Sequence, residues 1–208
     1  MGKLFYRYGV MGSAKSLNLL TTAYNFEEKG ISFLILKPAV DNRSAVGFIA
    51  SRIEGMTRPC IDLKTDDNIY QSIKTFVDCQ ISAMQELPKW ILVDESQFLT
   101  EIQVDQLSLC ADKFNINIIC YGLRTDFRSK LFPGSKRLME IADKIEEIKS
   151  SCHCGNKAII NARISSDGKV LSSGEQILIG GNDKYVSLCR KCWRKAIGQY
   201  PGKEEDNE

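Results

Sequence analysis

Gly9-Val10-Met11-Gly12-Ser13-Ala14-Lys15-Ser16 is the most informative segment of the chain, and it follows a short strand-like run, residues 4–8. It nearly matches the pattern G-x-x-x-x-G-K-[ST], in which backbone N–H groups surround phosphates, the Lys contacts the β and γ oxygens and the Ser hydroxyl binds Mg²⁺. The helix that follows such a loop directs its positive end at the same anion. Ala14 stands where the pattern has its second Gly, so the alternative is an ordinary strand-to-helix turn. We expect residues 9–16, the phosphate loop, to bind phosphates.

A second strand-like run, residues 90–93, ends in the carboxylates Asp94 and Glu95. A nucleotide site of this kind needs an acid at the tip of a neighbouring strand to hold Mg²⁺, directly or through water. Asp94 fits that role, and Glu95 follows it where a base for an attacking hydroxyl would lie. An Asp-Glu pair alone is a common solvated strand end, so its meaning depends on the phosphate loop.

Composition limits the classes of protein that fit. Of 208 residues, 43% are hydrophobic and 26% charged, as in a globular protein of one domain, or of one domain and a small module. The net charge of +2 gives no electrostatic case for a nucleic-acid or membrane partner. The N-terminus leads directly into a strand, without a signal peptide or a membrane-spanning run, so we expect a cytoplasmic protein. The single histidine, His153, nearly excludes histidine as a general base.

Strand and helix patterns alternate along the first three quarters of the chain. Strands are expected at residues 3–8, 31–36, 90–94 and 116–121, helices at 15–29, 66–87 and 100–114, and a further helix and strand within 136–148. Residues 38–65 are expected to form a long loop with one short strand. Alternation of this kind predicts an α/β fold, a parallel sheet with helices on both faces, which binds ligands at the carboxyl ends of its strands.

Two cysteine pairs bracket the region after residue 148, where short β-type runs and turns replace the helices. Four thiolates in two close pairs favour a tetrahedral zinc site of Cys152, Cys154, Cys189 and Cys192, which would stabilise a region too small for much core. His153 could replace one ligand, and redox-labile pairs are the alternative. The other cysteines, Cys60, Cys79, Cys110 and Cys120, are expected to be core fillers or bystanders.

These patterns divide the chain into three parts. We expect a nucleotide-binding α/β domain at residues 1–148, a zinc-binding β domain at residues 149–196, and a disordered acidic tail at residues 197–208.

Four motifs in a fixed order resemble a known family. They are the phosphate loop, Val93-Asp94-Glu95-Ser96-Gln97-Phe98-Leu99, Tyr121-Gly122-Leu123-Arg124-Thr125-Asp126-Phe127-Arg128, and Gly174-Glu175-Gln176-Ile177-Leu178-Ile179-Gly180-Gly181-Asn182-Asp183-Lys184-Tyr185. Over nearly its whole length the chain is similar to the zinc-containing thymidine kinases of bacteria and animal cytosol. The resemblance implies a RecA-like domain, a zinc-anchored lasso loop over the nucleoside, a homotetramer, and feedback inhibition by thymidine triphosphate.

The resemblance also implies roles for individual residues. The nucleotide and Mg²⁺ would be bound by the phosphate loop with Asp41, Arg43, Asp94, Glu95, Ser96 and Gln97, and Glu95 would be catalytic. The thymine pocket would comprise Met11, Phe98, Leu123, Phe127, Ile177, Leu178, Ile179, Gly180, Gly181 and Tyr185. The four cysteines named above would bind structural zinc. The implied reaction converts ATP and thymidine to ADP and thymidine 5′-monophosphate. Arg43 or Arg128 would neutralise the negative charge of the phosphoryl group during its transfer.

Ala14 departs from the Gly that many relatives have, and Gly12 and Ser13 replace bulkier residues. If position 14 requires a positive φ, Ala costs on the order of 1 kcal/mol of strain; if it does not, the loop closes normally.

Two other functions compete with a nucleoside kinase. Asp94-Glu95-Ser96-Gln97 also resembles the acid motif of helicases, which with a zinc ribbon would indicate a nucleic-acid-stimulated ATPase. The low net charge, the lack of a basic stripe and the short chain oppose it. The other competing function is that of a nucleotide-binding regulator without catalysis, and the position of Glu95 as a candidate base argues against it.

Overall fold

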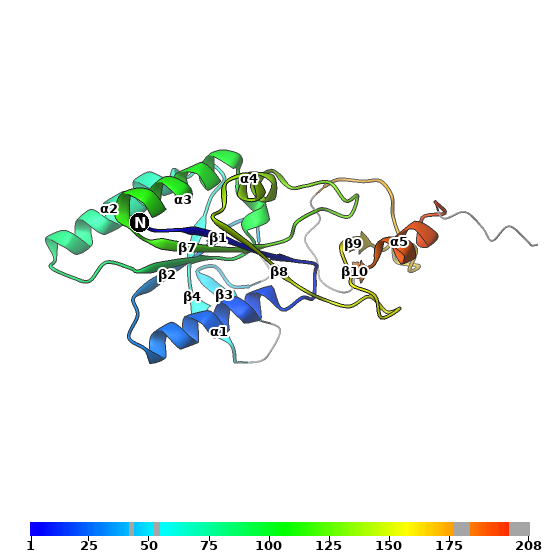
Figure 1. The fold of residues 1–208 in the computed structure, drawn as a ribbon, viewed down its shortest axis with the longest axis horizontal. Helices are drawn as coiled ribbons and strands as arrows, with labels where there is room; N and C mark the ends of the chain where they lie inside the picture. Colours follow the sequence, from blue (N-terminus) through cyan, green and yellow to red (C-terminus); the bar gives the residue numbers. More distant parts are fainter. Residues whose placement is uncertain (42–43, 52–54, 177–183, 200–208) are drawn as a thin grey trace, which may run out of the picture.

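The central element is a parallel β-sheet (Figure 1). Within residues 1–41, 44–51, 55–176 and 184–199, which the computed structural model describes, six strands form it in the order β5-β2-β6-β7-β1-β8. Their bounds are β1 (Leu4–Gly9), β2 (Phe33–Pro38), β5 (Ile61–Leu63), β6 (Trp90–Val93), β7 (Asn117–Gly122) and β8 (Lys144–Ile148). The prediction of an α/β fold with a parallel sheet is confirmed.

Helices cover both faces of the sheet. In Figure 1, α1 (Lys15–Glu28) lies on one side, and α2 (Ile69–Ser82), α3 (Glu101–Phe114) and α4 (Pro133–Ile141) lie on the other. Strand side chains alternate between the two faces. Leu92 therefore packs with Leu19 and Leu20 of α1, whereas Ile91 and Val93 belong to the core beneath α2 and α3.

Helix ends follow from local chemistry. The Thr100–Gln103 capping box predicted for α3 is confirmed, with each residue bonding the backbone N–H of the other. Helix α2 is shorter than the predicted span of 66–87. It starts at Ile69 because the Asn68 side chain accepts from the N–H of Gln71, and the left-handed backbone of Met84 (φ 54) prevents its continuation toward Pro88.

The segment predicted as a loop with one strand contains three short strands in the part that the structure describes. β3 (Phe48–Ala50) and β4 (Thr57–Pro59) pair with each other, and β5 extends the main sheet beside β2. The Lys37 side chain organises this segment from the interior: its Nζ donates to the Ser44 hydroxyl at 2.9 Å and to the Phe48 carbonyl at 3.1 Å.

A smaller unit follows the sheet, and we call residues 149–176 and 184–196 the cysteine module. Its strands β9 (Ile160–Arg163) and β10 (Tyr185–Leu188) are antiparallel, and α5 (Arg190–Ala196) follows them, a helix that the β-type sequence pattern did not predict. The acidic part of the predicted tail lies outside the described residues. Among the described helices, none has both the length and the apolar character needed to cross a bilayer.

Candidate active site

The predicted site residues follow four neighbouring strands at one edge of the sheet. The phosphate loop follows β1, Leu123 follows β7, Asp94 and Glu95 follow β6, and Asp41 follows β2. Because all four strands are parallel, their carboxyl ends lie together, which is where α/β sheets bind ligands. Arg43 and residues 177–181, also predicted for the site, lie outside the described residues.

The phosphate loop is tightly folded between β1 and α1. A Cβ on Gly9 would lie 2.7 Å from the Ile148 carbonyl oxygen and 2.3 Å from the Ser13 hydroxyl oxygen, so this position tolerates no side chain. Lys15 is buried, and its Nζ donates to the Val10 carbonyl at 2.9 Å. Ala14 has φ 61 and ψ 32, a left-handed conformation that the usual Gly adopts without strain. Position 14 therefore does require a positive φ, and the Cβ of Ala14 makes this conformation strained.

Ser16 and Asp94 meet across the gap between α1 and β6. The Ser16 hydroxyl donates to Asp94 Oδ2 at 2.9 Å. The other carboxylate oxygen, Oδ1, is buried without a hydrogen-bond partner among the described residues, and so is the Ser13 hydroxyl. Burial, followed by the neighbouring charge of Glu95, raises the pKa of Asp94 to about 7. The Ser16 hydroxyl and the Asp94 carboxylate, one oxygen of which has no hydrogen-bond partner among the described residues, are oxygen ligands of the kind that suits Mg²⁺.

Glu95 is held by Gln97, two residues further along. Glu95 is buried in a left-handed conformation (φ 48), and the Gln97 side-chain amide donates to its carboxylate. The Gln97 side-chain oxygen, Oε1, accepts from the N–H of Leu123 at 2.9 Å. A Cβ on Gly122 would lie 2.6 Å from the Ser96 hydroxyl oxygen, so Gly122 permits this close approach. Gln97, assigned to the nucleotide by resemblance, is therefore engaged with the carboxylate.

An arginine that the sequence analysis missed links the residues predicted to contact thymine. Arg163, only 4% exposed, stacks over the Phe127 ring with its Cζ 4.0 Å from the ring centre. Its Nη2 donates to the Tyr185 hydroxyl at 2.7 Å, and its Nη1 donates to the Glu175 carbonyl at 2.8 Å. Arg163 thus joins the loop after β7, strand β10 and the start of the motif at residues 174–185.

Three further predicted residues occupy different surroundings. Phe98 is half-buried and packs edge-on against Phe132, whereas Leu123 is buried. Arg128, the other candidate for neutralising the phosphoryl group, bonds the Asp126 carboxylate through Nε and Nη2.

The four predicted zinc ligands form one cluster. The sulfurs of Cys152, Cys154, Cys189 and Cys192 all lie within 4.8 Å of one another. Tetrahedral Zn–S bonds of about 2.3 Å place sulfurs roughly 3.8 Å apart, and the Cys154–Cys189 separation is 3.6 Å. Hydrogen bonds from Asn156 lower the pKa of Cys154 to about 6, whereas contact with Cys154 raises the pKa of Cys192 to about 12, so Cys154 is the readier thiolate of these two. The cluster suits zinc, and His153 is not part of it.

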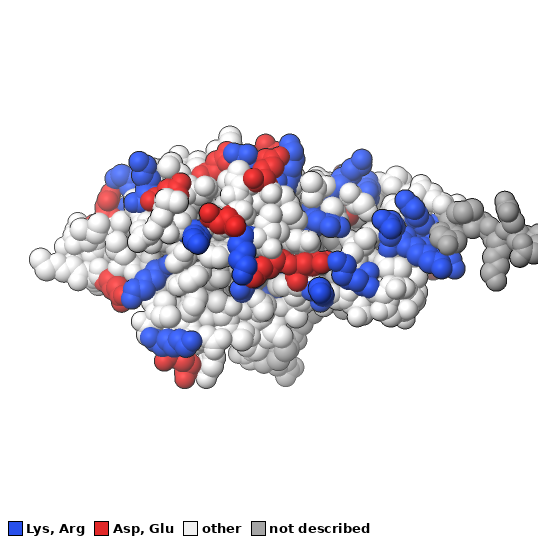
Figure 2. Space-filling view, in the orientation of Figure 1, with Lys and Arg blue, Asp and Glu red and all other residues white. Residues whose placement is uncertain are grey.

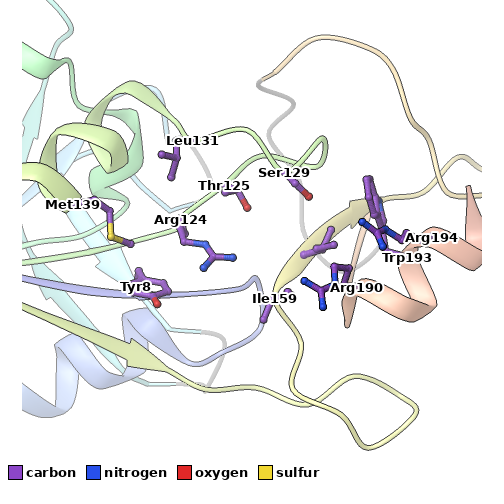
Figure 3. A pocket seen from close by; sticks show the side chains of 11 residues that line it. Tyr8, Arg124, Thr125, Ser129, Leu131, Met139, Ile159, Arg190, Trp193 and Arg194 are labelled. Atoms are coloured by element: carbon purple, nitrogen blue, oxygen red, sulfur yellow. The ribbon is translucent and has the colours of Figure 1, made fainter. Parts of the chain in front are cut away.

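A cavity of about 620 Å³ lies between α4, β1, β9 and α5 (Figure 3). Arg124, Arg190 and Arg194 line it, and no residue predicted for the site does. Lys and Arg side chains also gather over α5 on the surface, whereas both charges mix over the α/β domain (Figure 2). Because none of the predicted site residues lines it, this cavity is distinct from the candidate site at the carboxyl ends of the strands.

Comparison with known proteins identifies relatives along almost the entire chain. The family model described as thymidine kinase matches residues 2–193. A thymidine kinase of Agrobacterium fabrum is 45% identical over 193 residues, covering 93% of this chain and 96% of the relative. A thymidine kinase of Vibrio vulnificus is 42% identical over 201 residues, covering 96% and 100%. A third, from Legionella pneumophila, is 43% identical over 195 residues, covering 94% and 90%.

Proposed function

We propose a mechanism for this site from the premise that the chain belongs to the thymidine kinase family and has thymidine kinase activity. The acceptor is the 5′-hydroxyl of thymidine, and the donor is the γ-phosphoryl group of ATP. Phosphoryl transfer requires alignment and charge neutralisation more than covalent chemistry. The observation that carries the assignment of roles is the Ser16–Asp94 contact beside Glu95, at the strand end next to the phosphate loop.

The phosphate loop binds the triphosphate. Its backbone N–H groups surround the β- and γ-phosphates, and Lys15 exchanges its bond to the Val10 carbonyl for the phosphate oxygens. Ser16 and Asp94 hold Mg²⁺, which neutralises charge on the phosphates when it is bound. The vacant Oδ1 of Asp94 supports this role because a buried carboxylate oxygen without a partner is costly.

Glu95 accepts the proton of the thymidine 5′-hydroxyl. The new bond joins the 5′-oxygen to the γ-phosphorus as the bond to the β-phosphate bridging oxygen breaks, giving thymidine 5′-monophosphate and ADP. Gln97 orients the Glu95 carboxylate, and its own amide cannot turn because its oxygen accepts from Leu123 N–H. Arg43 remains the candidate for stabilising the transferring group, because Arg128 is paired with Asp126.

The nucleoside base is bound between the cysteine module and the sheet edge. Met11, Phe98, Leu123, Phe127 and Tyr185 provide apolar contacts to the base, Asp41 contacts the sugar and phosphates, and main-chain groups of residues 176–181 contact the base edge. Thymine presents an N3–H donor between two carbonyls, whereas cytosine presents an N3 acceptor beside an amino group. Fixed main-chain groups that satisfy thymine would leave cytosine with opposed groups, each costing about 1–3 kcal/mol.

The larger assembly and regulation are part of the same proposal. Zinc bound by the four cysteines stabilises the 149–196 domain, separate from the nucleotide-binding domain of residues 1–148. We further propose a cytoplasmic homotetramer that is inhibited by thymidine triphosphate, as the family resemblance implies. The nucleic-acid-stimulated ATPase has no support from the comparisons, in which the relatives are thymidine kinases.

A nucleoside panel with ATP, scored for monophosphate product, tests the substrate assignment. We expect thymidine to be preferred, deoxyuridine to be a weaker substrate because one buried methyl contributes about 0.8 kcal/mol, and deoxycytidine to be poorer by about 100-fold or more. Equal kcat/KM for deoxycytidine and thymidine would contradict the base assignment. ATP hydrolysis stimulated by single-stranded DNA but not by thymidine would contradict the kinase mechanism.

A further inference from the structure

One residue of the phosphate loop is held on both sides of its main chain by the cysteine module. The N–H of Met11 donates to the Asn161 side-chain oxygen at 2.7 Å, and the Met11 carbonyl accepts from the Ser187 hydroxyl at 2.6 Å. Asn161 on β9 and Ser187 on β10 are directly opposite each other in the antiparallel pair. The cross-strand pair Asn161–Ser187 therefore bonds both main-chain polar groups of Met11.

The orientation of Asn161 is determined by a third contact. Asn161 is 2% exposed, and its Nδ2 donates to the Thr125 carbonyl at 2.9 Å. The Thr125 carbonyl can only accept a hydrogen bond and the Met11 N–H can only donate one, so the NH₂ group of Asn161 must face Thr125 and its oxygen must face Met11. Asn161 thus connects the phosphate loop to the segment that follows β7.

Packing joins the same parts of the chain. Val10, the neighbour of Met11 in the phosphate loop, is buried in a cluster with Ala162, Leu188 and the metal-site residues Cys152 and Cys189. The Val10 carbonyl also accepts from Lys15. A shift of the cysteine module would therefore move both the backbone and the lysine that face the phosphates.

We propose that Asn161 and Ser187 are positioning residues for the phosphate loop, so that the cysteine module controls ATP affinity as well as covering the nucleoside. The proposal rests on the phosphate-binding role given above to residues 9–16. The loop binds phosphate through the direction of its N–H groups, and that direction depends on the peptide planes on either side of Met11. The two bonds from β9 and β10 hold those planes before the nucleotide arrives.

The test measures binding of a non-hydrolysable ATP analogue with Mg²⁺ by calorimetry, without thymidine, and binding of thymidine alone. The variants are Ser187→Ala and Asn161→Ala. Ser187→Thr, which keeps the hydroxyl, is the rescue variant, and Val186→Ala, at an exposed side chain of the same strand, is the control. Zinc content and melting temperature are measured for every variant.

We expect Ser187→Ala to weaken analogue binding about 3- to 10-fold and Asn161→Ala at least about 10-fold, as expected for loss of buried hydrogen bonds. Ser187→Thr should bind within about twofold of the parent protein, Val186→Ala should not differ, and zinc content should be unchanged. Parental analogue affinity in both Ser187→Ala and Asn161→Ala would overturn the proposal. Equal weakening of analogue and thymidine binding with a lowered melting temperature in both would also overturn it, by showing general destabilisation.

Lys15→Ala separates this proposal from the function on which it rests. If Lys15→Ala loses analogue binding while the two positioning variants keep it, positioning by the cysteine module is refuted and the phosphate loop stands. If Lys15→Ala itself binds normally, the role of the phosphate loop is refuted.

Discussion

Glu95 combines a buried carboxylate with a backbone conformation that costs an ordinary residue about 1–2 kcal/mol. Such a conformation persists where the surroundings enforce it. Here Gln97 bonds the carboxylate and Leu123 bonds Gln97, so the position of the carboxylate depends on the strand end of β7.

Glu95→Gln should retain binding of ATP and thymidine but lose turnover by at least about 100-fold, because it keeps the shape of the side chain and removes the base. Single-turnover kinetics and binding isotherms check this. Glu101→Gln on the surface of α3 is the matched control and should turn over normally. Near-normal turnover of Glu95→Gln with an unchanged pH profile would remove Glu95 from this role.

Arg163 is a second residue whose function depends on geometry. Its planar group stacks on Phe127 and donates to the Tyr185 hydroxyl and the Glu175 carbonyl. Arg163→Lys should weaken thymidine binding about 10-fold and leave ATP binding within about twofold, because a lysine can neither stack nor donate in a fork. Lys169→Met, at an exposed turn of the same module, is the control. Unchanged thymidine affinity in the lysine variant would show that the fork is not needed.

Arg163, Asn161 and Ser187 could not be identified from the sequence. No local pattern marks these polar residues, because their contacts form only where β9 pairs with β10 and both pack on the phosphate loop. The Met11–Asn161 contact, for example, joins residues 150 positions apart. The phosphate loop and Asp94-Glu95 could be predicted, because their spacing and their positions after apolar runs are local properties.

Among the elements, prediction succeeded where the signal was contained in the element itself. The Thr100–Gln103 box marks the start of α3, and apolar runs mark β6 and β7. Strands of three residues, as in β3 to β5, are too short to display alternation, and they depend on Lys37 bonding from the interior. Helix α2 ended early because Met84 adopts a left-handed backbone, which no local residue pattern announces.

The junction of the phosphate loop and α1 contains removable strain. Ala14→Gly should increase the free energy of unfolding by about 1 kcal/mol, because glycine adopts φ 61 without a Cβ clash. Urea denaturation measures the change. Ala142→Gly, at a position with φ −67, is the control and should be neutral or destabilising. Destabilisation of Ala14→Gly would indicate that the methyl group contributes packing that outweighs the strain.

For the protein as a whole, the cysteine cluster links metal content to substrate binding. One zinc per chain is expected by elemental analysis, and Cys189→Ser should lower both zinc content and thymidine affinity, because Cys189 follows β10 and caps α5. Cys79→Ser, at an exposed cysteine of α2, should change neither. A zinc-free protein that is folded and fully active would contradict this coupling.

The strand order has a consequence for synthesis on the ribosome. β1 is made first, yet it lies between β7 and β8, with Leu4 opposite Ile118 and Phe5 opposite Lys144. Its backbone groups therefore have no native strand partner until most of the domain has emerged, and such a strand is open to pairing with other chains. Nascent chains that stop before residue 117 should thus be the aggregation-prone species, and the strand that they leave unpaired is the one that leads into the phosphate loop.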